Sequence, residues 1–423
     1  MDFKQYPSYK DSGVEWLGEV PEHWQQKPIW SLFSRIKRVN HPNEPLLSVY
    51  RDYGVILKDS RDDNHNRASE DLTPYQLVRP NDLVINKMKA WQGSIAISEY
   101  QGIVSPAYYV YEPKQPYCSK YIHFLIRSTY FIQSYKNFSK GIRVNQWDLE
   151  HDAFTHIDLL LPPLSEQNKI VSFLDTETSR IDHLIAKQEK LIEKLEEHRK
   201  SVISHAVTKG LDPNVPMKDS GVEWLGEVPE HWVGSKFKYI FQEKQHTKNM
   251  NLPFGAISFG SVVYKKDKAN LTDELKENYQ EVLQGEFLVN PLNLNYDLKS
   301  LRTALSKIDV VVSSGYFVLK LKNNTFNKRY LEYLLYIFDI RKMKTLGAGI
   351  RQTLTFKDMA VCDVAIPSAC EQTQIASFLD YENFRIDNLI AKQEKLIEKL
   401  KEYRTSIISH AVTGKIDVRD LVA

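Results

Sequence analysis

Two arginines in the sequence occur where a side chain could bind nucleic acid. The tripeptide Gly-Ile-Arg is found at residues 141–143 and at 349–351, each time after a basic, aromatic segment that ends near Lys140 or Lys344. A guanidinium can bind phosphate oxygens or the O6 and N7 atoms of guanine. Arg143, Arg351, Lys140 and Lys344 are therefore candidate DNA contacts. An arginine that caps the preceding helix is an equally acceptable interpretation.

A second group of candidate DNA contacts follows a predicted strand at residues 82–86. It combines two amides, two lysines and an aromatic ring within seven residues: Asn86, Lys87, Lys89, Trp91 and Gln92. Such side chains can bind base edges when a strand end presents them. They can also simply cover the edge of a sheet, and this structural interpretation is somewhat favoured.

Motifs for catalysis are missing from the sequence. It contains no Gly-x-x-x-x-Gly-Lys-Ser/Thr, no Gly-x-Gly-x-x-Gly and no Asn-Pro-Pro-Tyr/Phe. Cys118, Cys362 and Cys370 have no Cys-x-x-Cys spacing, so we expect buried free thiols and no zinc site. His205 and His410 are lone histidines on predicted helices, and no metal site is expected at either. The sequence thus predicts no catalytic residues.

The elements that must position the candidate residues are duplicated. The segment KDSGVEWLGEVPEHW occurs without a difference at residues 10–24 and 218–232, and a longer block at 166–208 recurs with few changes at 371–413. Between these blocks the two halves hardly resemble each other. Two near-identical surfaces suit two copies of one partner, whereas two dissimilar domains suit two different targets.

The longer repeated block predicts a long amphipathic helix in each half, with an apolar heptad seam. Gln188 and Gln393 occupy equivalent seam positions, where an amide can specify the register of a helix pair or can reach solvent at the helix edge. A kink near residues 175–178 and a continuous helix are both compatible with the pattern, and a glycine predicts each helix end. The seam residues proposed for helix pairing and partner binding are Leu184, Gln188, Leu191 and Leu195, and Leu389, Gln393, Leu396 and Leu400.

The divergent regions, residues 25–162 and 233–367, predict mixed α/β domains. Short runs rich in β-branched residues alternate with turns, and aromatic helices at 120–135 and 328–343 are expected in the core. Landmarks such as Asp82 and Glu286 recur in the same order, so both domains are expected to share a fold. We expect an α/β (α+β) protein with boundaries at 1–162, 163–212, 213–367 and 368–423, and two helices that pair antiparallel and bring the termini together.

Composition adds little about function. Apolar residues make up 42 % and charged residues 26 %, as in ordinary globular proteins, and the net charge of +2 does not by itself indicate nucleic-acid binding. The first residues do not resemble a signal peptide, and no apolar run is long enough to cross a bilayer. We therefore expect a cytoplasmic protein without a membrane partner.

The repeated segments resemble the specificity subunit of Type I restriction-modification systems. The resemblance rests on YKDSGVEWLGEVPEHW, on its repetition, and on the proline and Glu-Gln entry into the FLD, RID and KQEKLIEKL segments. It implies a non-catalytic chain with two target recognition domains, each specifying one half of a split, asymmetric DNA site. The helices would form an antiparallel spacer and bind two methyltransferase subunits.

The same resemblance implies that S-adenosylmethionine is held by those methyltransferase subunits, with no cofactor in this chain, and that restriction and translocase subunits join the full complex. The repeated Trp16, Trp24, Trp224 and Trp232 could dock each domain on the helices or contact the methyltransferase, and docking is preferred because exposed tryptophan is costly. A duplicated coiled-coil scaffold that binds only proteins is the alternative function.

Overall fold

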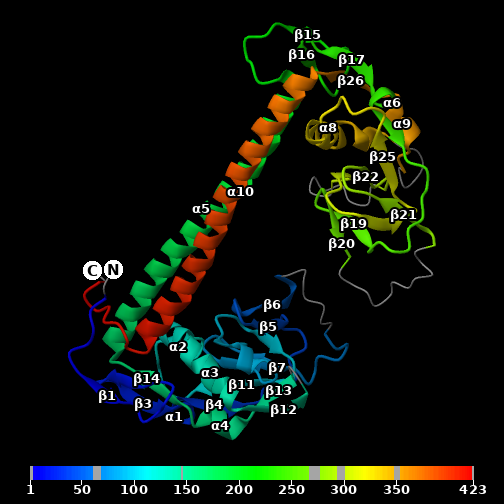
Figure 1. Ribbon diagram of the computed structural model, residues 1–423. Helices are drawn as coiled ribbons and strands as arrows, with labels where there is room; N and C mark the ends of the chain where they lie inside the picture. Colours follow the sequence, from blue (N-terminus) through cyan, green and yellow to red (C-terminus); the bar gives the residue numbers. More distant parts are fainter. Residues whose placement is uncertain are drawn as a thin grey trace. The chain divides into compact units, whose positions relative to one another are not determined.

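The structure is a computed structural model that describes residues 3–60, 68–143, 146–265, 277–292, 301–346 and 353–421. For residues 140–143, 146 and 344 it describes only the backbone. The chain forms two compact units, residues 1–189 with 394–423 and residues 190–393. Each unit contains one α+β domain together with part of both long helices, α5 (Leu164–Lys209) and α10 (Ala369–Val412) (Figure 1).

The first α+β domain is built on a four-stranded antiparallel sheet in the order β4-β11-β8-β9. The strands are β4 (Phe33–Ile36), β11 (Tyr108–Pro113), β8 (Leu83–Asn86) and β9 (Ile95–Ile97). Five further antiparallel pairs surround the sheet: β1 (Tyr9–Asp11) with β2 (Glu19–Pro21), β3 (Gln25–Pro28) with β14 (Asp158–Leu161), β5 (Leu47–Tyr50) with β6 (Gly54–Leu57), β7 (Gln76–Val78) with β10 (Gly102–Val104), and β12 (Ser139–Arg143) with β13 (Gln146–Leu149).

The second α+β domain repeats this topology, as the sequence predicts. Its sheet has the order β18-β25-β22-β23, formed by β18 (Phe241–Glu243), β25 (Phe317–Leu321), β22 (Phe287–Val289) and β23 (Thr303–Leu305). The other pairs are β15 (Met217–Asp219) with β16 (Glu227–Pro229), β17 (Val233–Lys236) with β26 (Asp363–Ile366), β19 (Gly255–Ser258) with β20 (Ser261–Tyr264), and β21 (Tyr279–Val282) with β24 (Val310–Ser313).

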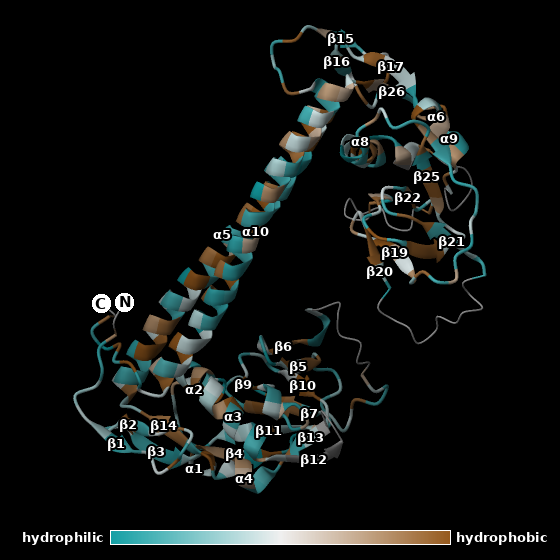
Figure 2. Cartoon of the chain, viewed as in Figure 1, coloured by the Kyte–Doolittle hydropathy of each residue, from teal (hydrophilic) through white to brown (hydrophobic). Residues whose placement is uncertain are grey.

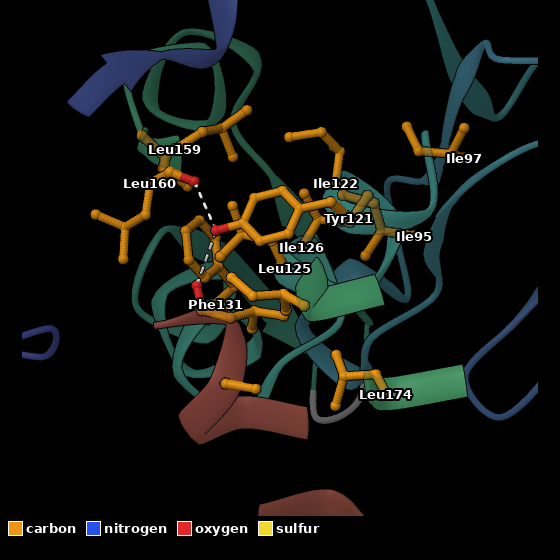
Figure 3. Packing of buried hydrophobic residues seen from close by; sticks show 14 of the residues in the cluster. Ile95, Ile97, Tyr121, Ile122, Leu125, Ile126, Phe131, Leu159, Leu160 and Leu174 are labelled. Atoms are coloured by element: carbon orange, nitrogen blue, oxygen red, sulfur yellow. Dashed lines mark hydrogen bonds between the residues drawn. The ribbon is translucent and has the colours of Figure 1, made fainter. Parts of the chain in front are cut away.

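Aromatic helices pack into both cores, as predicted, although the first is divided. Residues 120–135 fall in α2 (Ser119–Ile126) and α3 (Thr129–Asn137), because Ser128 adopts an extended backbone between them. Tyr121 of α2 is fully buried, and its hydroxyl donates to the carbonyls of Leu160 and Val412 at 3.0 and 3.2 Å (Figure 3). The second domain has one aromatic helix, α8 (Lys328–Arg341).

Short helices complete the two domains. The first contains α1 (Ile29–Leu32), α4 (His151–Thr155) and the 3-10 turns η1 (Lys58–Ser60) and η2 (Ala90–Gln92), and the second contains α6 (Phe237–Ile240), α9 (Phe356–Ala360) and η3 (Met343–Thr345). Hydrophobic colours concentrate on the strands of both sheets, whereas both long helices alternate polar and apolar residues (Figure 2). The cores are therefore made mainly by the strands and the aromatic helices.

The long helices are continuous. They span 46 and 44 residues, and α5 alone is about 70 Å long at ~1.5 Å per residue. Thr178 does not break α5, because its hydroxyl donates to the carbonyl of Leu174 at 2.6 Å and so is satisfied within the helix. Each helix ends before a left-handed glycine, Gly210 with φ +76° and Gly414 with φ +71°, as predicted.

The two ends of the chain meet in the first unit. Lys4 forms an isolated β-bridge with Asp417, and its ammonium lies 3.3 Å from the carboxylate of Asp420. Figure 1 shows the N- and C-termini side by side. The predicted proximity of the termini is thus confirmed.

Candidate nucleic-acid interface

The two groups of predicted DNA contacts in the first α+β domain lie side by side. The backbone N–H of Leu149 in β13 donates to the carbonyl of Lys87 at 3.1 Å, and the Lys87 ammonium lies 3.2 Å from the Asp148 carboxylate. These contacts place the segment after β8 beside the β12–β13 hairpin, which carries Arg143. Residues far apart in the sequence therefore form one surface, which we call the first interface surface: residues 86–92, 139–143 and 146–149.

Some side chains of this surface are held by contacts within the protein, whereas others are exposed to solvent. The rings of Trp91 and Trp147 pack with centroids 5.0 Å apart, and the Trp91 indole donates to the carbonyl of Met88 at 3.2 Å. Asn86 donates to the hydroxyl of Tyr108 at 3.4 Å, so its amide turns toward the sheet. Lys89 and Gln92 are exposed. Among these predicted contacts, Lys89 and Gln92 are the best placed to meet a ligand.

The backbone places Arg143 in a strand and not in a loop directly after the helix. Phe138 is the C-cap of α3, and its N–H donates to the carbonyls of Ser134 and Lys136. Arg143 ends β12, in register with Gln146 across the hairpin. The side chains of Arg143 and Lys140 lie outside the described atoms, so the contacts of their charged groups remain a prediction.

The second α+β domain repeats part of this arrangement. The N–H of Leu354 donates to the carbonyl of Pro291 at 3.0 Å, as Leu149 does to Lys87 in the first domain. Pro291 follows β22 as Lys87 follows β8. Arg351 and the Lys344 side chain lie outside the described part of the chain, so their predicted roles stay predictions.

The recurring acidic landmarks Asp82 and Glu286 have a structural role. Asp82 accepts from Arg38 at 2.6 Å and from the N–H of Arg79 at 2.8 Å. Glu286 accepts from Lys244 at 2.9 Å and from the N–H of Leu283 at 2.8 Å. Burial raises the pKa of the Asp82 carboxyl, whereas its hydrogen bonds lower the pKa and offset part of that effect. Each carboxylate therefore fixes the turn before a central strand.

The repeated Trp-containing segment docks on the start of each long helix. Trp24 is buried, and its indole donates to Glu166 of α5 at 3.0 Å, while the His23 ring nitrogen lies 2.8 Å from the other oxygen of the same carboxylate. In the second unit the indole of Trp232 donates to Glu371 at 3.0 Å, and His231 repeats the contact of His23 at 3.0 Å. For Trp24 and Trp232, docking on the helices is what the structure shows.

The ends of the helices contact the same segments. A Cβ placed on Gly414 would lie 2.3 Å from Cδ of Pro21, and the Lys415 ammonium donates to the carbonyl of Leu17 at 2.8 Å. In the second unit, Gly210 lies beside Trp232 and Pro229. Each repeated segment thus contacts the beginning of one long helix and the end of the other.

Equivalent ion pairs set the register of the helices in each unit. The Arg404 guanidinium of α10 donates to Asp182 of α5 at 2.8 Å in the first unit. In the second unit Arg199 of α5 donates to Asp387 of α10 at 2.6 Å. Asp387 and Arg404 are the repeat counterparts of Asp182 and Arg199. Antiparallel pairing of the predicted seam therefore occurs within both units.

The sequence also matches a known protein family in both halves. Residues 21–196 and 225–402 match the Type I restriction modification DNA specificity domain. The chain belongs to this family. Each specificity domain contains most of one α+β domain and most of the long helix that follows it, and the tandem arrangement agrees with the duplicated fold.

Similar whole proteins are specificity subunits. The Type I restriction enzyme MjaVIII specificity subunit of Methanocaldococcus jannaschii is 26 % identical, over 82 % of this chain and 81 % of that protein. The StySPI specificity subunit of Salmonella potsdam is 21 % identical, over 94 % of this chain and 90 % of the relative. Both matches span most of the two chains, so the similarity extends beyond a single specificity domain.

Solved structures share the fold of the tandem specificity domains. The HsdS subunit from Thermoanaerobacter tengcongensis has a TM-score of 0.52 at 15 % identity, covering 96 % of this chain and 100 % of that one. A chain from a study of complex assembly and conformational transition of the type I R-M system has a TM-score of 0.64 at 14 % identity, covering 93 % and 98 %. The predicted fold class is thereby confirmed.

The seam residues of the specificity domains are only partly covered. Leu184, Gln188, Leu195, Leu389, Gln393 and Leu400 are partly buried. Leu191 and Leu396, which are repeat counterparts, are each 41 % exposed. The middle of both helices therefore retains accessible apolar side chains that a partner could cover.

Other predictions concern the thiols, metals and membranes. The three cysteines are free, but the expectation of burial is wrong for Cys370, which is exposed at the start of α10, and Cys118 and Cys362 are only partly buried. Among the described residues no group of His, Cys, Asp or Glu side chains could hold a metal ion. Within the same ranges no helix is long and apolar enough to cross a membrane.

Sequence analysis missed Trp147 and Asp148 of the first interface surface. Both follow the Gly-Ile-Arg tripeptide closely, but their pairing with Trp91 and Lys87 depends on the hairpin that returns them to the segment after β8. The QWDL run, with an aromatic and an acidic residue beside the tripeptide, was the available signal.

Proposed function

We propose that this chain is the non-catalytic DNA-recognition subunit of a Type I restriction-modification complex. Each α+β domain recognises one half of a bipartite, asymmetric DNA site. The chain positions methyltransferase subunits, which hold S-adenosylmethionine, and the restriction and translocase subunits of the full complex. This function agrees with membership of the specificity domain family.

The observation that carries the proposal is a shared fold with divergent surfaces. Both α+β domains have the same strand order, yet the residues that follow the shared Asn86 and Asn290 differ: Lys87 and Met88 in the first domain, and Pro291 and Leu292 in the second. Base recognition requires different side chains for different sequences, whereas a common scaffold can present them. Two such domains in one chain therefore support an asymmetric target.

Equivalent surfaces on the two long helices support the proposal that methyltransferase subunits bind this chain. The exposed leucines Leu191 and Leu396 and the partly buried glutamines Gln188 and Gln393 occupy equivalent repeat positions on α5 and α10. Equivalent apolar side chains on two helices suit two copies of the same protein. The alternative function, a scaffold that binds only proteins, does not explain why two domains with one fold have different surfaces. Family membership does not favour this alternative either.

Mapping of methylated adenines tests the proposed function. The chain should be co-expressed with its methyltransferase in a host that has no other adenine methylation, and the genome should then be sequenced with detection of modified bases. We expect one motif made of two different half-sites at a constant spacing. Methylation that depends on the methyltransferase alone, or a motif unchanged when this chain is omitted, would contradict the proposal.

A further inference from the structure

Phe259 at the turn of the β19–β20 hairpin combines two unfavourable features. It is 83 % exposed, the highest value among the large hydrophobic residues that the structure describes, and its backbone has a left-handed φ of +46°. A side chain with a Cβ is disfavoured in this conformation, which glycine adopts freely. Gly260, the next residue, has φ +72° without that penalty. A two-residue hairpin turn favours a left-handed backbone here, but asparagine or glycine adopts it at a lower cost than phenylalanine, so the exposed ring is a candidate for a functional contact.

The first α+β domain has an aromatic residue at the equivalent turn. Its β5–β6 hairpin pairs Leu47 with Leu57 and Tyr50 with Gly54, as β19–β20 pairs Gly255 with Tyr264. Tyr53 lies in this turn and is 60 % exposed. The turns differ in length and sequence, yet both present an aromatic ring.

Both turns border the segments that follow the central strands. A Cβ placed on Gly93, the C-cap of η2, would lie 3.5 Å from Cγ of Arg51 in the β5–β6 turn. In the second domain a Cβ placed on Gly260 would lie 2.6 Å from Leu301, just before β23, and β23 is the counterpart of β9. The β5–β6 turn therefore extends the first interface surface, and the β19–β20 turn has the equivalent position.

A partly buried arginine holds the β5–β6 turn in place. The guanidinium of Arg127 donates to the carbonyls of Tyr50 at 3.3 Å and Ile95 at 3.1 Å, and also to the carbonyl of Arg51. These bonds join the turn to β9. Tyr53 is thus carried by a hairpin whose base is fixed to the sheet.

We propose that Tyr53 and Phe259 contact bases of duplex DNA, Tyr53 in the first half-site and Phe259 in the second. Each ring packs on, or partly inserts at, a base step next to the groups that the interface surface presents. Apolar side chains inserted between base pairs and aromatic rings stacked on bases are established modes of contact with nucleic acid. The inference rests on the proposed function and adds a specific contact to it.

Duplex DNA fits these turns better than a protein partner does. Each turn projects one aromatic ring, whereas a specific protein interface requires a broad, contiguous contact area. Basic groups lie on the same hairpins: Arg51 is exposed in the first turn, where its guanidinium lies 3.0 Å from the Asp52 carboxylate, and Lys265 directly follows β20. An exposed aromatic ring at a hairpin turn with a basic residue on the same hairpin suits a base step flanked by phosphates.

The test uses the full methyltransferase complex and duplexes that carry its mapped target. Binding should be measured for the cognate duplex and for duplexes altered in either half-site. We expect Phe259→Ala to weaken cognate binding about tenfold or more, as loss of a base–aromatic contact does, and to reduce discrimination only at the second half-site. Tyr53→Ala should act on the first half-site, and Phe259→Trp should retain binding. Tyr239→Ala removes a 59 % exposed ring from α6 and should change nothing.

Phe259→Gly separates binding from folding. It relieves the left-handed backbone and exposes no apolar ring, so the melting temperature should stay equal or rise while DNA binding falls as in Phe259→Ala. If the unmodified complex shows no sequence preference, the proposed function fails. If it recognises a bipartite site but Phe259→Ala and Tyr53→Ala behave like Tyr239→Ala, the base contacts are overturned. Loss of methyltransferase from the Phe259→Ala complex with unchanged DNA affinity would identify a protein contact and would also overturn them.

Discussion

At the scale of single residues, Glu166 joins the repeated segment to α5 through three donors. Its carboxylate accepts from the Tyr6 hydroxyl at 2.8 Å and from the Trp24 indole at 3.0 Å, and His23 lies 2.8 Å away. Because this carboxylate is buried, water could not replace it as the acceptor for these donors. The residue therefore connects domain and helix as well as filling a position in the repeat.

We expect Glu166→Ala to lower the free energy of unfolding by about 2 to 4 kcal/mol, since it leaves the indole and phenol donors of Trp24 and Tyr6 without an acceptor. Glu166→Gln should cost less, because its amide oxygen can still accept. Urea unfolding measures both. The control is Glu193→Ala at an exposed position of α5, which should change the value by less than about 0.5 kcal/mol. Equal effects at Glu166 and Glu193 would contradict the connecting role.

His123 makes the stability of the first α+β domain depend on pH. Burial, with a smaller contribution from Arg127, lowers the pKa of His123 from 6.5 to about 4. Between these values the unfolded chain binds a proton at His123 that the folded chain does not. Its contribution is therefore fully present above pH 6.5 and is lost as the pH falls toward 4.

The expected loss is about 2 to 3 kcal/mol, below the full value for such a pKa change because the ring is not completely shielded from solvent. As the pH is lowered from 7.5 to 4, the urea concentration at the unfolding midpoint should fall less steeply for His123→Gln than for the natural chain. Subtracting the two profiles removes the contribution of the carboxylates that titrate in the same range. Parallel profiles would show that His123 does not cause the pH dependence.

Arg143 is predicted to recognise one half-site. If its guanidinium makes a bidentate contact with a base, Arg143→Ala should cost about 1 to 3 kcal/mol of binding free energy and relax specificity in that half only. Binding to duplexes randomised in one half measures this. A uniform loss across unrelated sequences would indicate a phosphate contact, and an unchanged affinity would remove Arg143 from the interface. Arg351 is expected to serve the other half-site in the same way.

At the scale of elements, α5 and α10 are held in register by repeated ion pairs. Asp182 with Arg404 and Arg199 with Asp387 are exposed pairs, so each contributes only about 0.2 to 1 kcal/mol. Their main effect is on the register of the helices, because both pairs can form together in only one antiparallel alignment of α5 and α10. Continuity of both helices makes their length a property that can be engineered.

We expect helix length to determine the spacing between half-sites. Inserting one heptad after Leu195 and the matching heptad after Leu400 keeps the apolar seam and lengthens the helix pair by up to ~10 Å, which corresponds to two or three base pairs at ~3.4 Å each. Methylation mapping should show a spacer longer by about that amount. Insertion in α5 alone is the control, since it cannot preserve both ion pairs. An unchanged spacer in a folded double-insertion complex would refute a spacing role for the helices.

At the scale of the whole molecule, duplication provides two equivalent sets of helix residues. Each compact unit combines one α+β domain with the beginning of one long helix and the end of the other. The same residues of the repeat therefore occur in corresponding surroundings twice. Two copies of one methyltransferase subunit are the simplest partners for such an arrangement.

Native mass spectrometry of the co-expressed complex should show two methyltransferase subunits for each copy of this chain. Replacing Leu191 by Glu should weaken one of the two binding events, and replacing Leu396 by Glu should weaken the other, because both leucines are exposed counterparts in the repeat. Leu164→Glu, at an exposed position at the start of α5, serves as the matched control. A complex that saturates at one methyltransferase would contradict equivalent sites.

Properties encoded by local pattern could be predicted from the sequence. Repetition indicated two domains with one fold, heptad spacing indicated long helices, and glycines indicated their ends. Periodicity depends on neighbours within a few turns, so these features do not require knowledge of distant contacts. Strand runs were identified for the same reason, whereas the division between α2 and α3 was missed because it depends on Ser128 and on the contacts of Arg127 with a distant turn.

Tertiary structure alone determined which residues form one surface. The contact between Lys87 and Asp148, the packing of Trp91 on Trp147 and the docking of Trp24 on Glu166 join segments that are distant in sequence. The exposed rings of Tyr53 and Phe259 became candidates only when their hairpins were placed beside the segments after the central strands. Side-chain type and spacing describe what a residue can do, but proximity is created by chain folding, which pairs strands and buries apolar faces across long sequence separations.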